Sequence, residues 1–352
     1  MDLVPGSPRF LLLPCAALLL FLAVSPGLLA QAWLPPKGDG SIEVSVQSIF
    51  FDGHYDDFGN KVRPCPTCPL GVGQSRATNL ILGLDYSFTD RLNVEISLPY
   101  VFTRYTGNPA DLTFGNPAFH AAPLDDGATH SAFQDFRFDV HYNVLSHSHR
   151  TGLQDLAITP FFSMIQPSHS YDFHGESAFG RDLREYAIGV TAARLLRPML
   201  PRAFAQVQYA YAFVEKVNGL GLNHSNVDLE LGYFLPHEAT VFAFGNWLRT
   251  HGGVTIGEVF ADPTLFPFHD RILRASYWHL GGGASYPVTR TFDVNFSYVT
   301  YLAGTTTHYG KGFTVGTAWN FSTRHLPSSD LQRSSKATPP PDQVEKTWAT
   351  AR

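Results

Sequence analysis

Residues 134–145 read Gln134-Asp135-Phe136-Arg137-Phe138-Asp139-Val140-His141-Tyr142-Asn143-Val144-Leu145, and this stretch decides the fold. Polar and apolar residues alternate in it without interruption from Asp135 to Val144. Successive side chains of a β-strand point to opposite faces, so one face here is apolar and the other carries ionisable groups and an amide. No helical period fits this alternation. The stretch therefore predicts a strand that separates an apolar environment from a wet one.

The same alternation recurs along the chain. It predicts eleven further strands at residues 42–47, 79–88, 92–103, 156–165, 186–196, 203–215, 226–235, 240–248, 277–288, 292–298 and 313–321. The composition agrees, because the chain is rich in Phe, Tyr, Gly and Pro and has only three Met residues. Such a mixture is typical of strands joined by turns rather than of helical bundles.

The connections between these strands decide between a soluble sandwich and a membrane barrel. Long connections follow the first, third, fifth, seventh, ninth and eleventh strands, and the others are short, for example Thr89-Asp90-Arg91 and Thr289-Arg290. Bacterial outer-membrane barrels show this order, with long loops outside and short turns in the periplasm. A closed sheet also pairs every backbone group within lipid. We therefore predict an all-β fold, a transmembrane antiparallel up-and-down β-barrel of about 12 strands.

Aromatic residues gather near the predicted strand ends, as expected where a barrel crosses both membrane interfaces. At the long-loop ends these are Phe50, Phe51, Phe102, Tyr105 and Phe213, and at the other ends Tyr86, Phe88, Phe234, Tyr286, Trp319 and Phe321. Ordinary core packing is the alternative explanation for each ring. The positional pattern favours two aromatic belts.

The N-terminus predicts export. Arg9 precedes the apolar run 10–24, and a breaker at 25–27 and the small-residue site Ala30-Gln31-Ala32 follow, as in a secretory signal peptide cut after Ala30 or before Trp33. The run has about fifteen residues, whereas a spanning helix needs about twenty. We predict a signal peptide at 1–32, the barrel at 33–322 and a disordered periplasmic tail at 323–352. The expected location is the outer membrane of a Gram-negative-type cell.

Two motifs resemble those of known families. The final strand ends Trp319-Asn320-Phe321, which is similar to the assembly signal of outer-membrane proteins, although about thirty residues follow it here. The segments 96–100 (Ile-Ser-Leu-Pro-Tyr), 134–138 and 160–184 resemble the outer-membrane transporter-like family named for the meta-pathway of phenol degradation. That resemblance implies a barrel and uptake of small, often aromatic, compounds, and it fixes no site residue.

Charged residues collect on the predicted inner face. The candidates for lining a lumen are Glu43, Asp85, Glu95, Asp135, Arg137, Asp139, His141, Arg184, Asp228, Glu230, Arg274 and Asp293. An acidic lumen would favour cations and neutral polar solutes over anions. Alternatively, these groups pair with one another inside a closed barrel, since twelve strands lie between the small filled barrels and the wide porins.

Cys65 and Cys68 lie together in the first long connection, and a disulfide is expected between them in an exported protein. The motif Cys-Pro-x-Cys resembles a thioredoxin-like redox site, but the strand and helix that activate such a thiol are missing. Nine of the fifteen His residues fall in or beside long connections. They show no helical ligand spacing, so we predict no metal site and no cofactor.

The predicted function is passive uptake of small, aromatic or hydrophobic, solutes through an outer-membrane channel. The alternatives are a closed structural or surface-binding barrel, and an outer-membrane lipid-modifying hydrolase with Ser177 and His174 as its nearest Ser/His pair. No Gly-x-Ser-x-Gly elbow is present, so no catalytic residue is assigned. The expected partners are outer-membrane lipid, the assembly machinery and the solute. A net charge of −5 with no Lys/Arg run excludes nucleic acid, and no oligomeric state is predicted.

Overall fold

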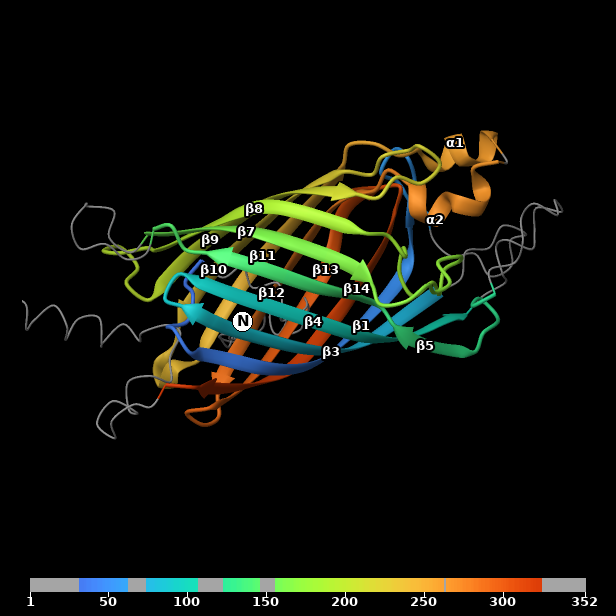
Figure 1. The fold of residues 1–352 in the computed structure, drawn as a ribbon. Helices are drawn as coiled ribbons and strands as arrows, with labels where there is room; N and C mark the ends of the chain where they lie inside the picture. The colour runs from blue at the N-terminus through green and yellow to red at the C-terminus, as the bar shows by residue number, and fades with distance from the viewer. Residues whose placement is uncertain (1–31, 63–73, 107–122, 146–155, 263, 325–352) are drawn as a thin grey trace, which may run out of the picture.

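The computed structural model describes residues 32–62, 74–106, 123–145, 156–262 and 264–324. Strands account for most of this chain (Figure 1). They are β1 (Asp39–Tyr55), β2 (Lys61–Val62), β3 (Gln74–Thr89), β4 (Leu92–Thr106), β5 (Thr129–Phe133), β6 (Asp135–Tyr142), β7 (Leu156–Pro167), β8 (Glu185–Leu195), β9 (Ala203–Val214), β10 (His224–Phe234), β11 (Thr240–Thr250), β12 (Ser276–Pro287), β13 (Phe292–Thr305) and β14 (Thr307–Ser322). The short helices are η3 (Pro236–Glu238), α1 (Ile256–Ala261), η4 (Phe266–Phe268) and α2 (His269–Ile272).

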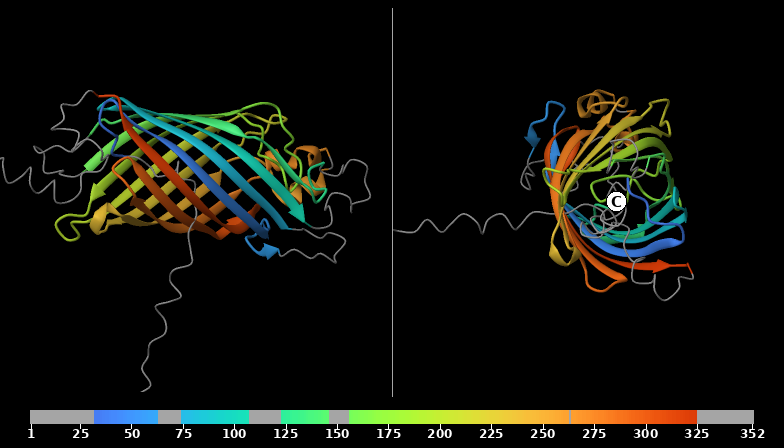
Figure 2. Two further views of the ribbon diagram at one scale, coloured as in Figure 1. Left: turned by 90° about the horizontal axis from the view of Figure 1, so that it is seen from below. Right: turned by 90° about the vertical axis from the view of Figure 1, so that its left-hand side faces the viewer.

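The strands form one antiparallel sheet that closes on itself. Each long strand pairs with its neighbours in chain order, and β14 pairs with β1 from Asp39–Ser322 to Tyr55–Thr307. The short strand β2 pairs only with β1, and β5 pairs only with β4 just before β6 begins. The wall therefore consists of twelve strands, and the ring is visible along its axis in the right panel of Figure 2. This confirms the predicted fold class and the number of strands.

The two ends of the barrel differ. At one end, the short-turn end, neighbouring strands are joined by tight connections such as residues 90–91 and 288–291. At the other, the long-loop end, lie β2, β5, the 168–184 connection, and the 251–275 connection with α1 and α2 (Figure 1). One prediction about this end was wrong. The eleventh connection is not a long loop, because β13 and β14 continue to a tight turn at Thr306, where φ is +52°.

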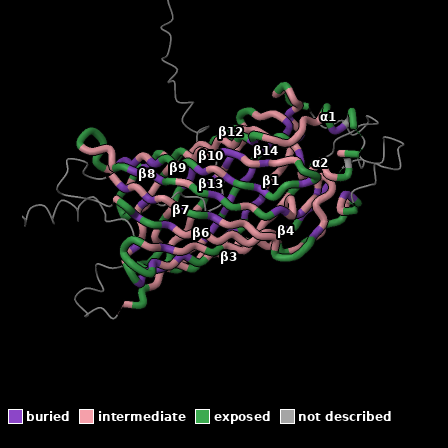
Figure 3. The backbone as a smooth tube through the Cα atoms, turned by 45° about the horizontal axis from the view of Figure 1, so that its top comes forward, coloured by how far each residue is buried: buried purple, intermediate pink, exposed green. Residues whose placement is uncertain are grey.

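Burial changes from residue to residue along many of the strands, as the colours in Figure 3 show, because side chains alternate between the two faces of the sheet. The exterior carries exposed apolar residues, among them Ile42, Val44, Val46, Leu80, Leu82, Leu84, Leu229, Leu231, Phe296, Val315 and Trp319. The opposite parity is polar: Ser45, Gln47, Asp85 and Asp139 are buried. An apolar exterior around a polar interior is the reverse of a soluble sandwich and is typical of a barrel in a membrane.

The aromatic belts are formed only in part as predicted. Phe102, Phe213, Phe88, Tyr286 and Trp319 are exposed on the outer surface near the strand ends. Tyr105, by contrast, is fully buried, because it shares the inward parity of Val101 and Thr103 on β4. Phe234 also turns inward, where its ring lies 5.2 Å from that of Phe204.

Glycines make room for large rings inside the barrel. A Cβ atom on Gly281 would lie 2.1 Å from the ring of Phe244, and one on Gly283 would lie 2.3 Å from that of Phe242. Gly189 and Gly232 accommodate Phe161 and Phe204 in the same way. The triple glycine at 281–283 therefore relieves crowding between β11 and β12.

Among the residues that the structure describes, no helix has the length and apolar character needed to cross a bilayer.

Placing a charge on the outer face should destabilise the barrel far more than placing it inside. Leu229, at the middle of β10, is exposed, whereas its neighbour Glu230 points inward. We expect Leu229→Arg to lower the free energy of unfolding from lipid vesicles by about 2–4 kcal/mol. Glu230→Arg, the matched control, should lose much less. Urea-dependent unfolding measures both, and equal losses would contradict this assignment of the two faces.

Candidate functional site

The barrel encloses a cavity of about 460 Å³. Its lining residues come from β1 and from the consecutive strands β6 to β13, with Arg181 from the 168–184 connection. Many of the lining residues are polar, Gln47, Arg137, Gln208, Asp228 and Asn246 among them. Aromatic rings interrupt this polar wall, namely Phe161, Phe242, Phe244, Tyr277 and Tyr301. The cavity therefore offers hydrogen-bonding groups and ring faces to a solute.

A row of inward carboxylates crosses three neighbouring strands of the barrel, next to Arg137 of the cavity lining. Glu95 on β4 pairs in register with Asp85 on β3 and with Asp139 on β6. Arg137 donates from Nε to Oδ2 of Asp139 over 2.6 Å, and the guanidinium also interacts electrostatically with Glu95. His141 Nε2 lies 3.6 Å from Glu95 Oε2. One arginine and one histidine therefore face three acidic groups, so the row is acidic in sum.

A second charged group lies two strands further along the wall, because Arg137 of β6 and Glu185 of β8 both pair with Ile165 of β7. Glu185 on β8 lies 3.4 Å from Nε2 of His224 and accepts a hydrogen bond of 3.3 Å from Nη2 of Arg181. Arg137 interacts electrostatically with both Glu185 and Asp228, so its charge is shared between the two charged groups. Charged side chains that meet in this way are the kind that determine ion selectivity in a narrow pore.

Amides rather than cations satisfy the remaining inward carboxylates. Asp228 accepts from Asn246 over 2.7 Å, from Asn226 over 2.8 Å and from Gln208 over 3.3 Å. Asn295 donates to Glu43 over 3.2 Å, and Asn320 donates to Asp293 over 2.6 Å. Gln206 hydrogen-bonds Glu230. Because an amide carries no net charge, the wall keeps an excess of negative charge.

The 168–184 connection folds back over the long-loop end. Tyr171 and Phe179 pack against the inward side chain of Val101, and the Tyr171 hydroxyl donates to Asp135. Burial, and then this hydrogen bond to a carboxylate, raises the pKa of Tyr171 above its ordinary value. The phenol therefore stays protonated and remains a donor at physiological pH.

Acidic residues of other connections hold the middle of this segment. Asp125 accepts from the backbone N–H groups of Glu176 and Ser177 and from the Ser177 hydroxyl, over 2.9, 2.8 and 2.6 Å. Asp270 accepts from the Gly175 N–H over 2.9 Å. Burial raises the pKa of both Asp125 and Asp270. Burial alone would also raise the pKa of Glu176, but the neighbouring His54 and His308 hold it well below its usual range.

The chain's own N-terminal segment enters the barrel at the short-turn end. Ala32 is fully buried, and its N–H donates to Oε1 of Gln206 over 3.0 Å. Its carbonyl accepts from Thr159 over 2.8 Å and from Asn143 over 3.0 Å. The neighbouring Trp33 packs edge-on against Phe204, with 5.9 Å between the ring centroids. Inward polar groups thus bind this segment through its main chain.

Two of the residues proposed to line a lumen lie elsewhere. Arg184 is exposed just before β8, and Arg274 is exposed in the 251–275 connection, where it donates to the carbonyls of Gly252 and Gly253. The parity explains both: Arg184 is in phase with the outward Tyr186, and Arg274 with the outward Trp278. The other ten candidates lie on the inward face of their strands.

Ser177 and His174 do not form a catalytic pair. The Ser177 hydroxyl is hydrogen-bonded to Asp125 and to the Leu124 carbonyl. Both ring nitrogens of His174 are used elsewhere, Nδ1 with Asp172 and Nε2 with the Pro267 carbonyl. A hydrolase of this type needs the base bonded to the nucleophile. Cys65 and Cys68, the predicted disulfide, lie outside the described residues.

Sequence reasoning missed several residues of the wall. Glu185, Arg181 and His224 form one of its two charged groups, and the aromatic rings of Phe242 and Phe244 were not assigned to it. A strict reading of parity would have found Glu185, because the exposed Tyr186, Ile188 and Val190 fix the outward phase of β8. Arg181 comes from a connection, where no periodicity applies.

Solved structures share this fold, although sequence comparison identifies no relative. No protein-family model matches the chain, and no curated protein shows significant similarity to it. The chain is similar to the COG4313 outer-membrane channel from Pseudomonas putida F1, with a TM-score of 0.61 and 14% identity over 85% of this chain and 100% of that one. A KdgM porin in complex with disordered oligogalacturonate matches at a TM-score of 0.40 (9% identity, 80% of this chain, 99% of the other), and a NanC porin at 0.43 (7%, 79% and 98%).

The likeness to the Pseudomonas putida structure concerns the fold, since the sequences share so few residues. It agrees with two observations on this chain, the closed twelve-stranded sheet and the apolar exterior. Together they identify the chain as an outer-membrane β-barrel.

Proposed function

We propose that this protein is a channel for the passive passage of small solutes, with a preference for cations and neutral polar or aromatic molecules over anions. The observation that carries the proposal is the cavity inside the barrel together with the inward carboxylates around it, which outnumber the inward arginines. Acidic groups in a narrow path favour cations and repel anions. The similar Pseudomonas putida structure is described as a channel, which agrees with this role.

The aromatic part of the proposal rests on the rings in the wall. Tyr277 lies 5.6 Å from Tyr301 between ring centroids, and His279 stacks on Tyr277 at 4.4 Å. Ring faces next to carboxylates suit a flat solute that carries a positive charge or a hydroxyl group. This is also what the resemblance to the transporter-like family of phenol degradation implies.

Current measurements on the purified protein in planar bilayers test both parts. Phenyltrimethylammonium is permanently charged, so it enters through the channel and not through the lipid. We expect it to block the current of a small inorganic cation more strongly than tetramethylammonium does. A barrel that conducts neither ion would favour the alternative of a closed structural or surface-binding barrel.

Neutralising an inward carboxylate should reduce the preference for cations. A unit charge about 8 Å from a passing ion contributes roughly 0.5 kcal/mol in water, which corresponds to about a twofold change in permeability. We therefore expect Glu230→Gln to lower the cation-to-anion permeability ratio about twofold, and the double variant with Glu43→Gln to lower it further. Reversal potentials in a salt gradient measure this. Asp262→Asn, a change at an exposed residue after α1, is the control and should leave the ratio unchanged.

The N-terminal segment should limit the current from the short-turn end. Asn143→Ala combined with Thr159→Val removes both donors to the Ala32 carbonyl. We expect a larger or more frequently open conductance in this variant. Thr191→Val is the matched control, because Thr191 is equally buried opposite Thr159 but bonds Gln208. Unchanged conductance in a properly folded double variant would contradict the proposal that the segment around Ala32 obstructs the barrel.

Signal-peptide cleavage after Ala30 fits this role better than cleavage before Trp33, because Ala32 then stays in the mature chain. Two partners are proposed as well, namely outer-membrane lipid and the assembly machinery. The exposed apolar belt would contact outer-membrane lipid, and β14 with Trp319 and Phe321 would present the aromatic signal to the assembly machinery. The mass of the mature protein tests the cleavage position.

A further inference from the structure

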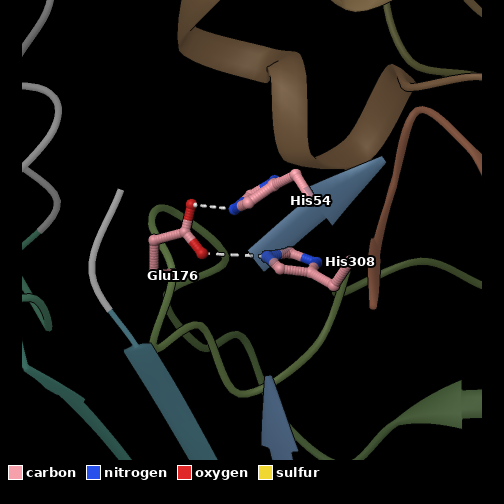
Figure 4. A group of neighbouring side chains, drawn as sticks. All are labelled: His54, Glu176 and His308. Atoms are coloured by element: carbon pink, nitrogen blue, oxygen red, sulfur yellow. Dashed lines mark hydrogen bonds and ion pairs between the residues drawn. The ribbon is translucent and has the colours of Figure 1, made fainter. Parts of the chain in front are cut away.

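Two histidines and one glutamate from three separate segments meet at the long-loop end (Figure 4). Nε2 of His54, near the end of β1, lies 3.1 Å from Oε1 of Glu176. Nε2 of His308, near the start of β14, lies 2.9 Å from Oε2 of the same carboxylate. The two imidazole rings are 4.3 Å apart between centroids, and the candidate ligand atoms of all three residues lie within 4.8 Å of one another.

A β-bulge creates this arrangement. Val44 and Val46 of β1 point outward, so regular alternation would send His54 outward as well. The register between β1 and β14 shifts between Phe51 and Gly53, and His54 then pairs with His308. Directly opposed residues of an antiparallel pair share a face, so both imidazoles point to the same side, toward Glu176.

The position of Glu176 is fixed independently of the two histidines. Its N–H donates to Asp125, and the preceding Gly175 donates to Asp270. Those two carboxylates also interact electrostatically with His308. The three carboxylates therefore outnumber the two histidines. The hydrogen bonds of the neighbouring backbone hold the Glu176 carboxylate in a fixed position, as a metal site requires.

We propose that His54, Glu176 and His308 bind one divalent transition-metal ion of the Zn²⁺ type. Two imidazole nitrogens and one carboxylate oxygen are a ligand set that Zn²⁺ accepts, with metal–ligand bonds of about 2.0–2.2 Å. Each imidazole nitrogen lies about 3 Å from its own oxygen of the Glu176 carboxylate, 3.1 Å for His54 and 2.9 Å for His308. The ligand atoms of all three residues lie within 4.8 Å of one another, so a small shift of these side chains brings them around one ion. Three protein ligands leave a fourth position for water or for a group of a passing solute.

Metal binding at this site would join three distant parts of the chain. The ion would connect the seam where β1 and β14 close the barrel to the 168–184 connection, which covers the long-loop end. A second group of candidate ligands, Glu95, Asp139 and His141, is less suitable. Asp139 already accepts the short bond from Arg137, whose positive charge opposes a second cation.

Titration of the purified full-length barrel, prepared without a polyhistidine tag and stripped with EDTA, tests the proposal. We expect saturable binding of one Zn²⁺ by calorimetry, and visible absorption bands of bound Co²⁺ that Zn²⁺ abolishes. His54→Ala, His308→Ala and Glu176→Gln should each weaken binding about tenfold or more. His174→Ala, in the same connection as Glu176, is the matched control and should bind as the unchanged protein does.

Two results would overturn the proposal. One is an unchanged protein that binds no Zn²⁺ in a saturable way. The other is retention of binding in the three site variants, or its loss in Glu95→Gln instead, which would move the ion to the second group. Heat-modifiable migration in gels shows which variants are folded. If an alanine variant fails to fold, His54→Gln and His308→Gln replace it, because they keep a polar side chain of similar length.

Discussion

The pairing of β1 with β14 is the constraint on which the rest of the structure depends. Inside a bilayer each unpaired backbone group costs several kcal/mol, so a sheet with free edges does not persist there. Sixteen register pairs, from Asp39–Ser322 to Tyr55–Thr307, close this edge. Closure in turn fixes which parity of every strand meets lipid. Leu82 and Leu231 are outside because the ring is complete, and Asp85 and Glu230 are inside for the same reason.

Closure also decides what the interior must contain. Twelve strands enclose too little space for large rings on every inward position, and the glycines opposite Phe161, Phe204, Phe242 and Phe244 make room for them. Buried charges need partners, since an isolated one is strongly disfavoured. Here Arg137 interacts electrostatically with several carboxylates, and amides such as Asn246 and Asn295 donate hydrogen bonds to others. Negative charge is thereby retained in the wall while most of its acidic groups have hydrogen-bond donors.

Period-two alternation was sufficient to predict the strands and the inward position of residues such as Asp139 and Asp228. It failed where the period changes or ends. Thr306 replaces an expected loop, and Ala32 lies before the first strand. Arg184 and Arg274, by contrast, were assigned to the inner face although the alternation places them outside. His54 and His308 are far apart in the sequence, and a bulge alone brings them to one face. Contacts between connections, such as that of Asp125 with Ser177, depend on closure of the whole ring and leave no local pattern.

The wall and the segments that cover its ends are held by interactions of different strength. Adjacent strands are joined by long ladders of backbone hydrogen bonds, whereas three hydrogen bonds hold Ala32 and a small set of bonds to Asp125, Asp270 and Asp135 holds the 168–184 connection. A hydrogen bond contributes about 1 kcal/mol net, and the packing of Tyr171, Phe179 and Trp33 adds to these bonds, yet the total number of contacts is far smaller than in the ladders of the wall. An ion bound by His54, Glu176 and His308 would strengthen the attachment of the 168–184 connection to the barrel. In the proposed channel, a change in solute passage would therefore come from the coverings rather than from the wall.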